Sequence, residues 1–132
     1  MSDTGQGKLR KLLAFAAIAE IGTGLVLMID PVIVVRLLLG ADIVGVGLVT
    51  GRCFGITLLA LGLACWPRGQ YAELGSPRVG MLVYNALIAL FLAYLFTVGH
   101  LGGVLLWPGV VLHAVVAALL VWLWRAGERE AR

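Results

Sequence analysis

Apolar residues along this chain fall into four long runs separated by short polar or glycine-rich stretches. A helix that crosses the ~30 Å hydrocarbon core of a bilayer needs about 20 mostly apolar residues. We therefore expect four membrane-spanning helices, over residues 12–29, 46–66, 79–98 and 104–124. The pattern predicts an all-α protein, an integral membrane four-helix bundle in which residues 1–132 form a single transmembrane domain.

A shorter apolar segment, residues 31–39, follows the first run and has too few residues to cross a bilayer. Asp30 is suited to cap a helix, Pro31 to its first turn and Gly40 to its end. We expect a short helix that lies at the membrane interface, with Arg36 reaching the lipid headgroups. A re-entrant element is the alternative interpretation of this segment.

The composition supports a lipid environment. Of the 132 residues, 61% are hydrophobic and 13% are charged, about half of the ~25% charged residues usual in soluble domains. A soluble domain of this size has too little interior for so much apolar surface. The pI of about 9.2 does not indicate a nucleic-acid partner, because the basic residues stand at the ends of the apolar runs, where lipid headgroups lie.

The basic residues also predict an orientation. In a four-span arrangement Arg36 stands on one side of the membrane. Eight basic residues share the opposite side: Lys8, Arg10, Lys11, Arg68, Arg78, Arg125, Arg129 and Arg132. Cytoplasmic loops carry the excess of lysine and arginine, so we expect a multi-pass protein of the cell (inner) membrane with both termini in the cytoplasm. Glu20 interrupts the first run, which then resumes, and this favours a retained helix over a cleaved signal peptide.

Small residues recur at intervals of four in the second predicted span. Gly47, Gly51 and Gly55 are spaced in this way, and Gly62 follows on the same helix. Small residues at this spacing allow helix backbones to approach closely, which stabilises helix packing in lipid. We interpret these glycines as packing residues, either inside one bundle or between the copies of a homo-oligomer.

Five polar residues inside the predicted spans are the candidate site. A rise of ~1.5 Å per residue places Glu20 and His113 near the middle of the membrane. Arg52 and Tyr94 then lie nearer the outer boundary, and Asn85 nearer the inner one. Ionisable residues at such depths are costly and often functional, so we expect an intramembrane polar cluster of these five residues.

Glu20 and Arg52 stand on consecutive, antiparallel spans, with an expected axial gap of about 6–8 Å. We predict that they form an ion pair inside the bundle, with Tyr94 or His113 completing the hydrogen bonds. Such a pair can fix helix register without any chemistry, or it can form part of a site that binds a headgroup, a quinone or a proton. An acidic or basic group of a partner subunit is a further candidate for either residue.

Familiar catalytic patterns are missing from the sequence. It contains no phosphate-binding glycine loop after a strand, no recognisable Ser/His/Asp spacing and no Cys/His metal set. Bis-histidine haem ligation would require a second histidine at the depth of His113, and His100 lies in a turn instead. We therefore expect no metal and no resident cofactor, and we lean towards a protein that is not an enzyme.

The order of LLG, GRCFGITLLALGLACW and YNALIALFLAYL in this sequence resembles the small bacterial four-helix membrane proteins of the broad DoxX-like group. The resemblance extends over most of the chain and consists mainly of hydropathy and glycine placement. Some members of that group are associated with quinone-linked oxidation, so the resemblance implies a quinone as an alternative ligand.

Two hypotheses about function follow from the sequence. The first is a non-enzymatic accessory or structural subunit of a larger membrane complex, or a self-associating scaffold in the lipid bilayer. The alternative is a membrane redox or transport component that binds a quinone, a lipid or a proton at the cluster of Glu20, Arg52 and His113. A cluster that is closed on all sides favours the first hypothesis, and a cluster that opens laterally favours the second.

Overall fold

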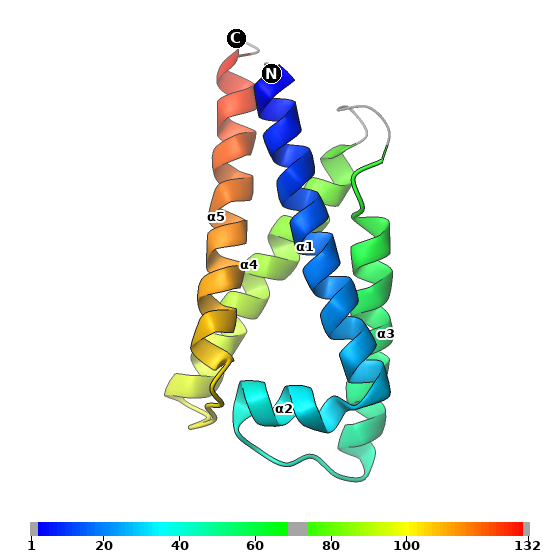
Figure 1. Cartoon of the computed structure of the whole chain (residues 1–132). Helices are drawn as coiled ribbons and strands as arrows, with labels where there is room; N and C mark the ends of the chain where they lie inside the picture. The colour runs from blue at the N-terminus through cyan, green and yellow to red at the C-terminus, as the bar shows by residue number, and fades with distance from the viewer. Residues whose placement is uncertain (1–2, 69–73, 131–132) are drawn as a thin grey trace.

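The structure is a computed structural model that describes residues 3–68 and 74–130, and these residues form five α-helices and contain no strand (Figure 1). The helices are α1 (Asp3–Ile29), α2 (Pro31–Leu39), α3 (Val46–Ala64), α4 (Gly75–Thr97) and α5 (Leu106–Glu130). Among them, α1, α3, α4 and α5 are long and apolar enough to cross a membrane. The predicted all-α bundle is confirmed, and it is consistent with a multi-pass membrane protein.

The long helices extend beyond the predicted spans at their polar ends. α1 begins at Asp3 rather than near residue 12, and α5 continues to Glu130 rather than ending near residue 124. Counting apolar residues misses these turns, because lysine, arginine and glutamate continue a helix well. α3 ends at Ala64, two residues earlier than predicted, and the Cys65 N–H caps it by donating to the Leu61 carbonyl over 2.9 Å.

α2 spans the predicted residues and has the predicted caps. The Asp30 carboxylate accepts a hydrogen bond from the Val32 N–H over 3.0 Å, and Pro31 occupies the first turn. Gly40 ends the helix in the left-handed conformation, with φ of 67°. In Figure 1 α2 lies across the end of the bundle that is opposite the two termini. Arg36 is exposed there and forms an ion pair with Asp42 over 2.6 Å.

The long helices pack as two pairs, α1 against α3 and α4 against α5, with smaller contacts from α1 to α4 and α5. α4 crosses the molecule obliquely, and the N- and C-termini lie at the same end (Figure 1). The largest group of buried apolar side chains comes from α1, α4 and α5 and from the residues between α3 and α4: Leu9, Leu13, Ala16, Ala17, Cys65, Leu74, Met81, Val116, Leu120 and Leu123. Most of this core therefore belongs to the half of the bundle near the termini.

Glycines determine how closely α1 and α3 approach. A Cβ on Gly55 would lie 2.6 Å from the Gly24 carbonyl oxygen, and a Cβ on Gly62 would lie 2.8 Å from the Ala17 carbonyl oxygen. Real Cβ atoms do not approach backbone this closely, so glycine is required at these two positions of α3. Gly51 faces Pro31, with 2.8 Å from the added Cβ to the proline Cβ, whereas Gly47 faces only its near neighbour Ile43.

The segment between α4 and α5 joins α2 to the rest of the bundle. The N–H groups of Gly102, Gly103 and Leu105 donate to the carbonyls of Leu39, Leu38 and Leu37 over 2.9, 3.0 and 2.8 Å. These bonds satisfy carbonyls at the end of α2 that have no partner within the helix. A Cβ on Gly103 would collide with the Leu37 carbonyl, so this contact also depends on glycine.

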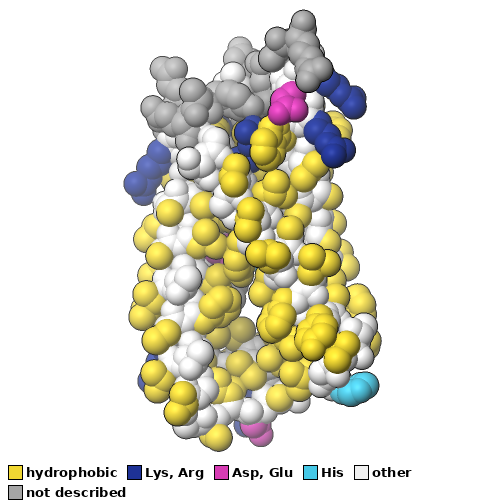
Figure 2. Space-filling model, turned by 180° about the vertical axis from the view of Figure 1, so that it is seen from behind, with side chains coloured by type: hydrophobic (Ala, Val, Ile, Leu, Met, Phe, Trp, Pro, Cys, Tyr) yellow, Lys and Arg dark blue, Asp and Glu magenta, His cyan; other side chains and the backbone are white. Residues whose placement is uncertain are grey.

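The surface also differs between the half of the bundle near the termini and the half near α2. In Figure 2 most lysine and arginine side chains gather at the end that carries the termini, and hydrophobic side chains cover the rest of the visible face. The same view shows a hollow between the two helix pairs, in the half of the molecule near α2. The helix pairs are thus tightly packed near the termini and spread apart towards α2.

Candidate functional site

Glu20 is a carboxylate buried within the membrane-spanning part of α1, with 3% of its surface exposed. The side of α1 that contacts α3 includes Ala17, Ile21 and Gly24. Glu20 lies at the edge of this side, about 100° around the helix from Ile21, and its carboxylate meets side chains of α4 and α5. A buried carboxylate is costly unless it is hydrogen-bonded, so the groups that meet Glu20 define the candidate site.

Two side chains of α4 and α5 meet this carboxylate, and a third, Asn85, meets the histidine. The Tyr84 hydroxyl donates a hydrogen bond to Glu20, and the His113 Nδ1 lies 3.9 Å from the Glu20 Oε1. The Tyr84 and His113 rings pack edge to face, with centroids 5.8 Å apart. The His113 Nδ1 is also 2.8 Å from the Asn85 Oδ1. We call Glu20, Tyr84, Asn85 and His113 the polar cluster.

Asn85 determines which nitrogen of His113 carries the proton. The Asn85 Nδ2 donates to the Met81 carbonyl over 2.8 Å, one turn earlier on α4. The amide oxygen is therefore the group that faces His113, and an amide oxygen only accepts hydrogen bonds. The His113 Nδ1 must then be the donor. In the neutral ring this leaves the Nε2 as an acceptor.

The polar cluster is closed around its carboxylate and slightly open at its imidazole. The Glu20 side chain is 4% exposed and the His113 side chain 15% exposed, while Asn85 is 1% exposed as a residue. Hydrogen bonds between such groups are strong in an apolar interior, and leaving one of them unpaired is costly. The arrangement can hold three helices in register, and it can offer the His113 Nε2 to a hydrogen-bond donor from outside.

Arg52 lies apart from the polar cluster, so the expected ion pair between Glu20 and Arg52 is wrong. Arg52 is exposed, and no ion pair joins it to any residue that the structure describes. Gly24 and Gly55 oppose each other, with Glu20 four residues before Gly24 and Arg52 three residues before Gly55. Because α1 and α3 are antiparallel, these offsets add to about 10 Å along the axis.

The direction of the Arg52 side chain also separates it from Glu20. Arg52 lies beside the face that carries Gly51, Gly55 and Gly62, about 100° around the helix from Gly51 and about 60° from Gly55. Its side chain is exposed and is not enclosed between α3 and α1. The sequence indicated that the two residues are on neighbouring helices, but it did not indicate which face of α3 meets α1.

Tyr94 is also outside the polar cluster. It is 54% exposed and stacks on Phe91 of the same helix, with ring centroids 6.5 Å apart. The tyrosine of the cluster is Tyr84, about 15 Å away along α4, which we did not predict. Its position next to Asn85, at the same depth, was the available signal.

The described residues add no metal site to this picture. Among the described residues, no group of three or more His, Cys, Asp or Glu side chains is placed to hold a metal ion. Cys53 is exposed and Cys65 is buried, and both are free thiols. The polar cluster therefore stands as the candidate site through its hydrogen-bonding groups alone.

We compared the chain with protein-family models, with curated proteins and with solved structures, and none of the three comparisons found a match.

Proposed function

We propose that this protein is a non-enzymatic subunit of a membrane assembly, which joins its partner through the outer face of α3. We also infer from its basic residues that it resides in a bacterial inner membrane with both termini in the cytoplasm. The partner is either a second copy of the chain or another membrane helix with an acidic or polar group. The observation that carries this proposal is the position of Arg52.

Arg52 lies on a helix face that the other described residues leave open. α3 packs mainly on α1, and the exposed residues on the side of Arg52 include Val49 and Ile56, at 62% and 54% exposure. Arg52 is about 9 Å from the start of α3. A charge at such depth is costly in lipid unless a partner or the headgroups receive it, and a polar group of a second subunit is the partner that fits an otherwise apolar face.

The polar cluster supports the same proposal in a structural role. The Glu20 carboxylate and the Asn85 amide are enclosed and have hydrogen-bond partners within the chain. A cluster whose carboxylate and amide are paired within the chain can fix the register of α1, α4 and α5. These two groups need no external partner, whereas Arg52 has no ion pair among the described residues and lies along an apolar span.

The test is the mass of the assembly in a lipid-like environment. The tagged chain is extracted in lipid nanodiscs or mild detergent, and light scattering gives the protein mass. Wild type should exceed the 14.0 kDa of one chain, and Arg52→Gln should shift the mass towards one chain. Arg36→Gln is the matched control, because Arg36 is exposed and already paired with Asp42. A monomeric wild type, or an unchanged mass in Arg52→Gln, contradicts the proposal.

A second candidate function is the binding of a lipophilic quinol or quinone at His113. It is favoured by the partial exposure of the His113 side chain and by the hollow between the helix pairs (Figure 2). The resemblance to the DoxX-like group points the same way. With its Nδ1 donating to Asn85, neutral His113 would accept a hydrogen bond at its Nε2 from a quinol hydroxyl. His113 therefore matches the quinol, which has a hydroxyl that can donate, better than the quinone.

This second candidate is tested by extracting the purified protein with organic solvent and measuring quinone. Stoichiometric quinone in wild type, lost in His113→Leu and retained in His100→Asn, would favour it over the subunit proposal. His100 is exposed in the segment between α4 and α5, which makes it the matched control. Equal traces of quinone in all three proteins would count against the candidate.

A further inference from the structure

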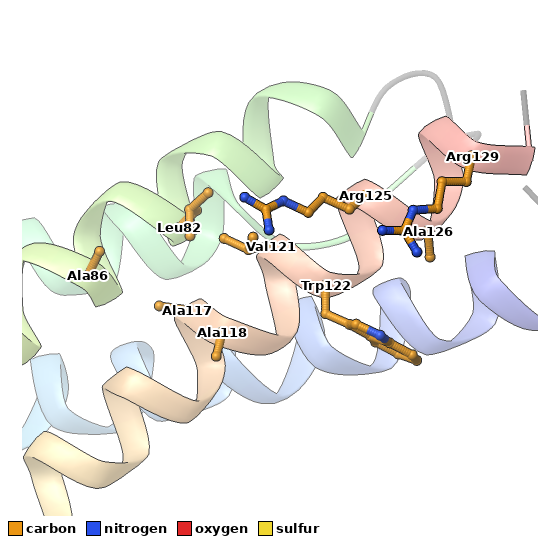
Figure 3. A pocket seen from close by; sticks show the side chains of 9 residues that line it. All are labelled: Leu82, Ala86, Ala117, Ala118, Val121, Trp122, Arg125, Ala126 and Arg129. Carbon is orange, nitrogen blue, oxygen red and sulfur yellow. The ribbon is translucent and has the colours of Figure 1, made fainter. Parts of the chain in front are cut away.

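A groove on the outer surface of α4 and α5 shares no residue with the polar cluster and has a distinct composition (Figure 3). Its volume is about 510 Å³, within the ~300–1,000 Å³ of typical ligand sites. Small side chains from both helices make room along one part of the groove, and two arginines stand at one end. The groove is lined by Leu82, Ala86, Ala117, Ala118, Val121, Trp122, Arg125, Ala126 and Arg129.

Among the described residues, the two arginines of this groove have no ion-pair or hydrogen-bond partner. Arg125 and Arg129 are one turn apart on α5, both are exposed, and neither has an ion pair or hydrogen bond among the described residues. In Figure 3 both guanidinium groups extend back along α5, and that of Arg125 reaches towards Leu82 of α4. Two positive charges thus stand over the groove, and no carboxylate of the described residues pairs with them.

The apolar part of the groove continues from these charges into the membrane-spanning segment. Ala118 precedes Arg125 by seven residues, about 10 Å along α5, and Ala86 contributes the facing wall from α4. Trp122 is 56% exposed, at the depth between the arginines and the alanines. Tryptophan is common at the membrane–water interface, which places the guanidinium groups at the level of the lipid phosphates.

We propose that this groove binds one anionic phospholipid of the leaflet that faces the termini. The phosphate would lie between Arg125 and Arg129, and an acyl chain would lie over Ala86, Ala117 and Ala118. Basic pockets between membrane helices bind anionic headgroups, and arginine matches the two-oxygen geometry of phosphate. The charge of the site selects this occupant over a neutral lipid, and the site is independent of the proposed contact at α3.

The test is native mass spectrometry of the purified chain with phosphatidylglycerol or phosphatidylcholine added in mild detergent. Wild type should bind phosphatidylglycerol on the order of tenfold more tightly than phosphatidylcholine, and Arg125→Gln/Arg129→Gln should remove this preference. The matched control is Lys8→Gln/Lys11→Gln, which removes two exposed charges from α1 at the same end of the molecule. The control should keep the preference within about twofold.

Two further results decide the proposal. Ala118→Leu fills the apolar part of the groove, so it should weaken the binding of both lipids while the preference for phosphatidylglycerol remains. This variant also keeps the test valid if the double arginine variant misfolds. Equal binding of the two lipids by wild type, or an equal loss in the lysine control, overturns the proposal. A protein dimer that dissociates in Arg125→Gln/Arg129→Gln regardless of lipid would assign the groove to a second copy instead.

Discussion

His113 donates a hydrogen bond from its Nδ1 to the Oδ1 of Asn85 over 2.8 Å, and this bond joins α5 to α4 inside the membrane-spanning part of the bundle. Replacing Asn85 with alanine leaves a buried imidazole N–H without its acceptor. We expect Asn85→Ala to lower the free energy of unfolding by about 1–3 kcal/mol. Circular dichroism during titration of the detergent-solubilised protein with a denaturing detergent measures this change.

The control for that variant is Tyr94→Phe. Tyr94 is exposed and its ring stacks on Phe91, and phenylalanine retains this stacking. Its free energy of unfolding should remain within about 0.5 kcal/mol of wild type. An Asn85→Ala variant as stable as Tyr94→Phe would show that the bond between α4 and α5 contributes nothing.

The contact between Glu20 and Tyr84 can be isolated with a double-mutant cycle. Tyr84→Phe removes the hydroxyl that donates to Glu20 and retains the ring that packs against His113. Combined with Glu20→Ala, it should show a coupling energy of about 0.5–3 kcal/mol in the same unfolding measurement. Additive effects of the two substitutions would mean that the hydroxyl and the carboxylate do not interact.

The close approach of α1 and α3 predicts opposite outcomes for two glycines. Gly55→Ala places a Cβ 2.6 Å from the Gly24 carbonyl oxygen, so it should lower the free energy of unfolding by about 1–3 kcal/mol. Gly22→Ala places its Cβ in open space on α1, and alanine favours the helix there by up to ~1 kcal/mol. Thermal unfolding in one detergent ranks the two variants, and equal melting temperatures would contradict the packing of α1 on α3.

The connection between α2 and the segment before α5 also depends on one glycine. Gly103→Ala should push this segment away from the Leu37 carbonyl and weaken the hydrogen bonds donated by Gly102 and Leu105. Hydrogen exchange of the amides at 102–105 should therefore be faster than in wild type. Gly75→Ala, whose Cβ meets no atom within 4 Å, is the control and should leave the exchange unchanged. Unchanged exchange in Gly103→Ala would exclude this role of the bonds.

Hydropathy and cap residues were sufficient to predict the five helices and their order, but not the polar turns at the ends of α1 and α5. Asp30, Pro31 and Gly40 marked the ends of α2 correctly, because capping depends on local backbone chemistry. The polar cluster was predicted only in part. Glu20, Asn85 and His113 were recognised by their depth, whereas the directions of Arg52 and Tyr84 depend on how the helices are rotated against each other. Tight contacts such as that of Gly55 with Gly24 set this rotation, and they become visible only once the helices are packed.

The central claim is that the Arg52 face of α3 contacts another protein within the membrane. Cross-linking from a photoreactive amino acid at Ile56, one turn after Arg52 on that face, tests it most directly in intact cells; Leu90 on α4, 69% exposed, serves as the control position. The account predicts a discrete protein adduct from position 56 that disappears when Arg52→Gln is added, and no such adduct from position 90. The absence of a protein adduct at position 56, or an adduct that persists in Arg52→Gln, would contradict the account.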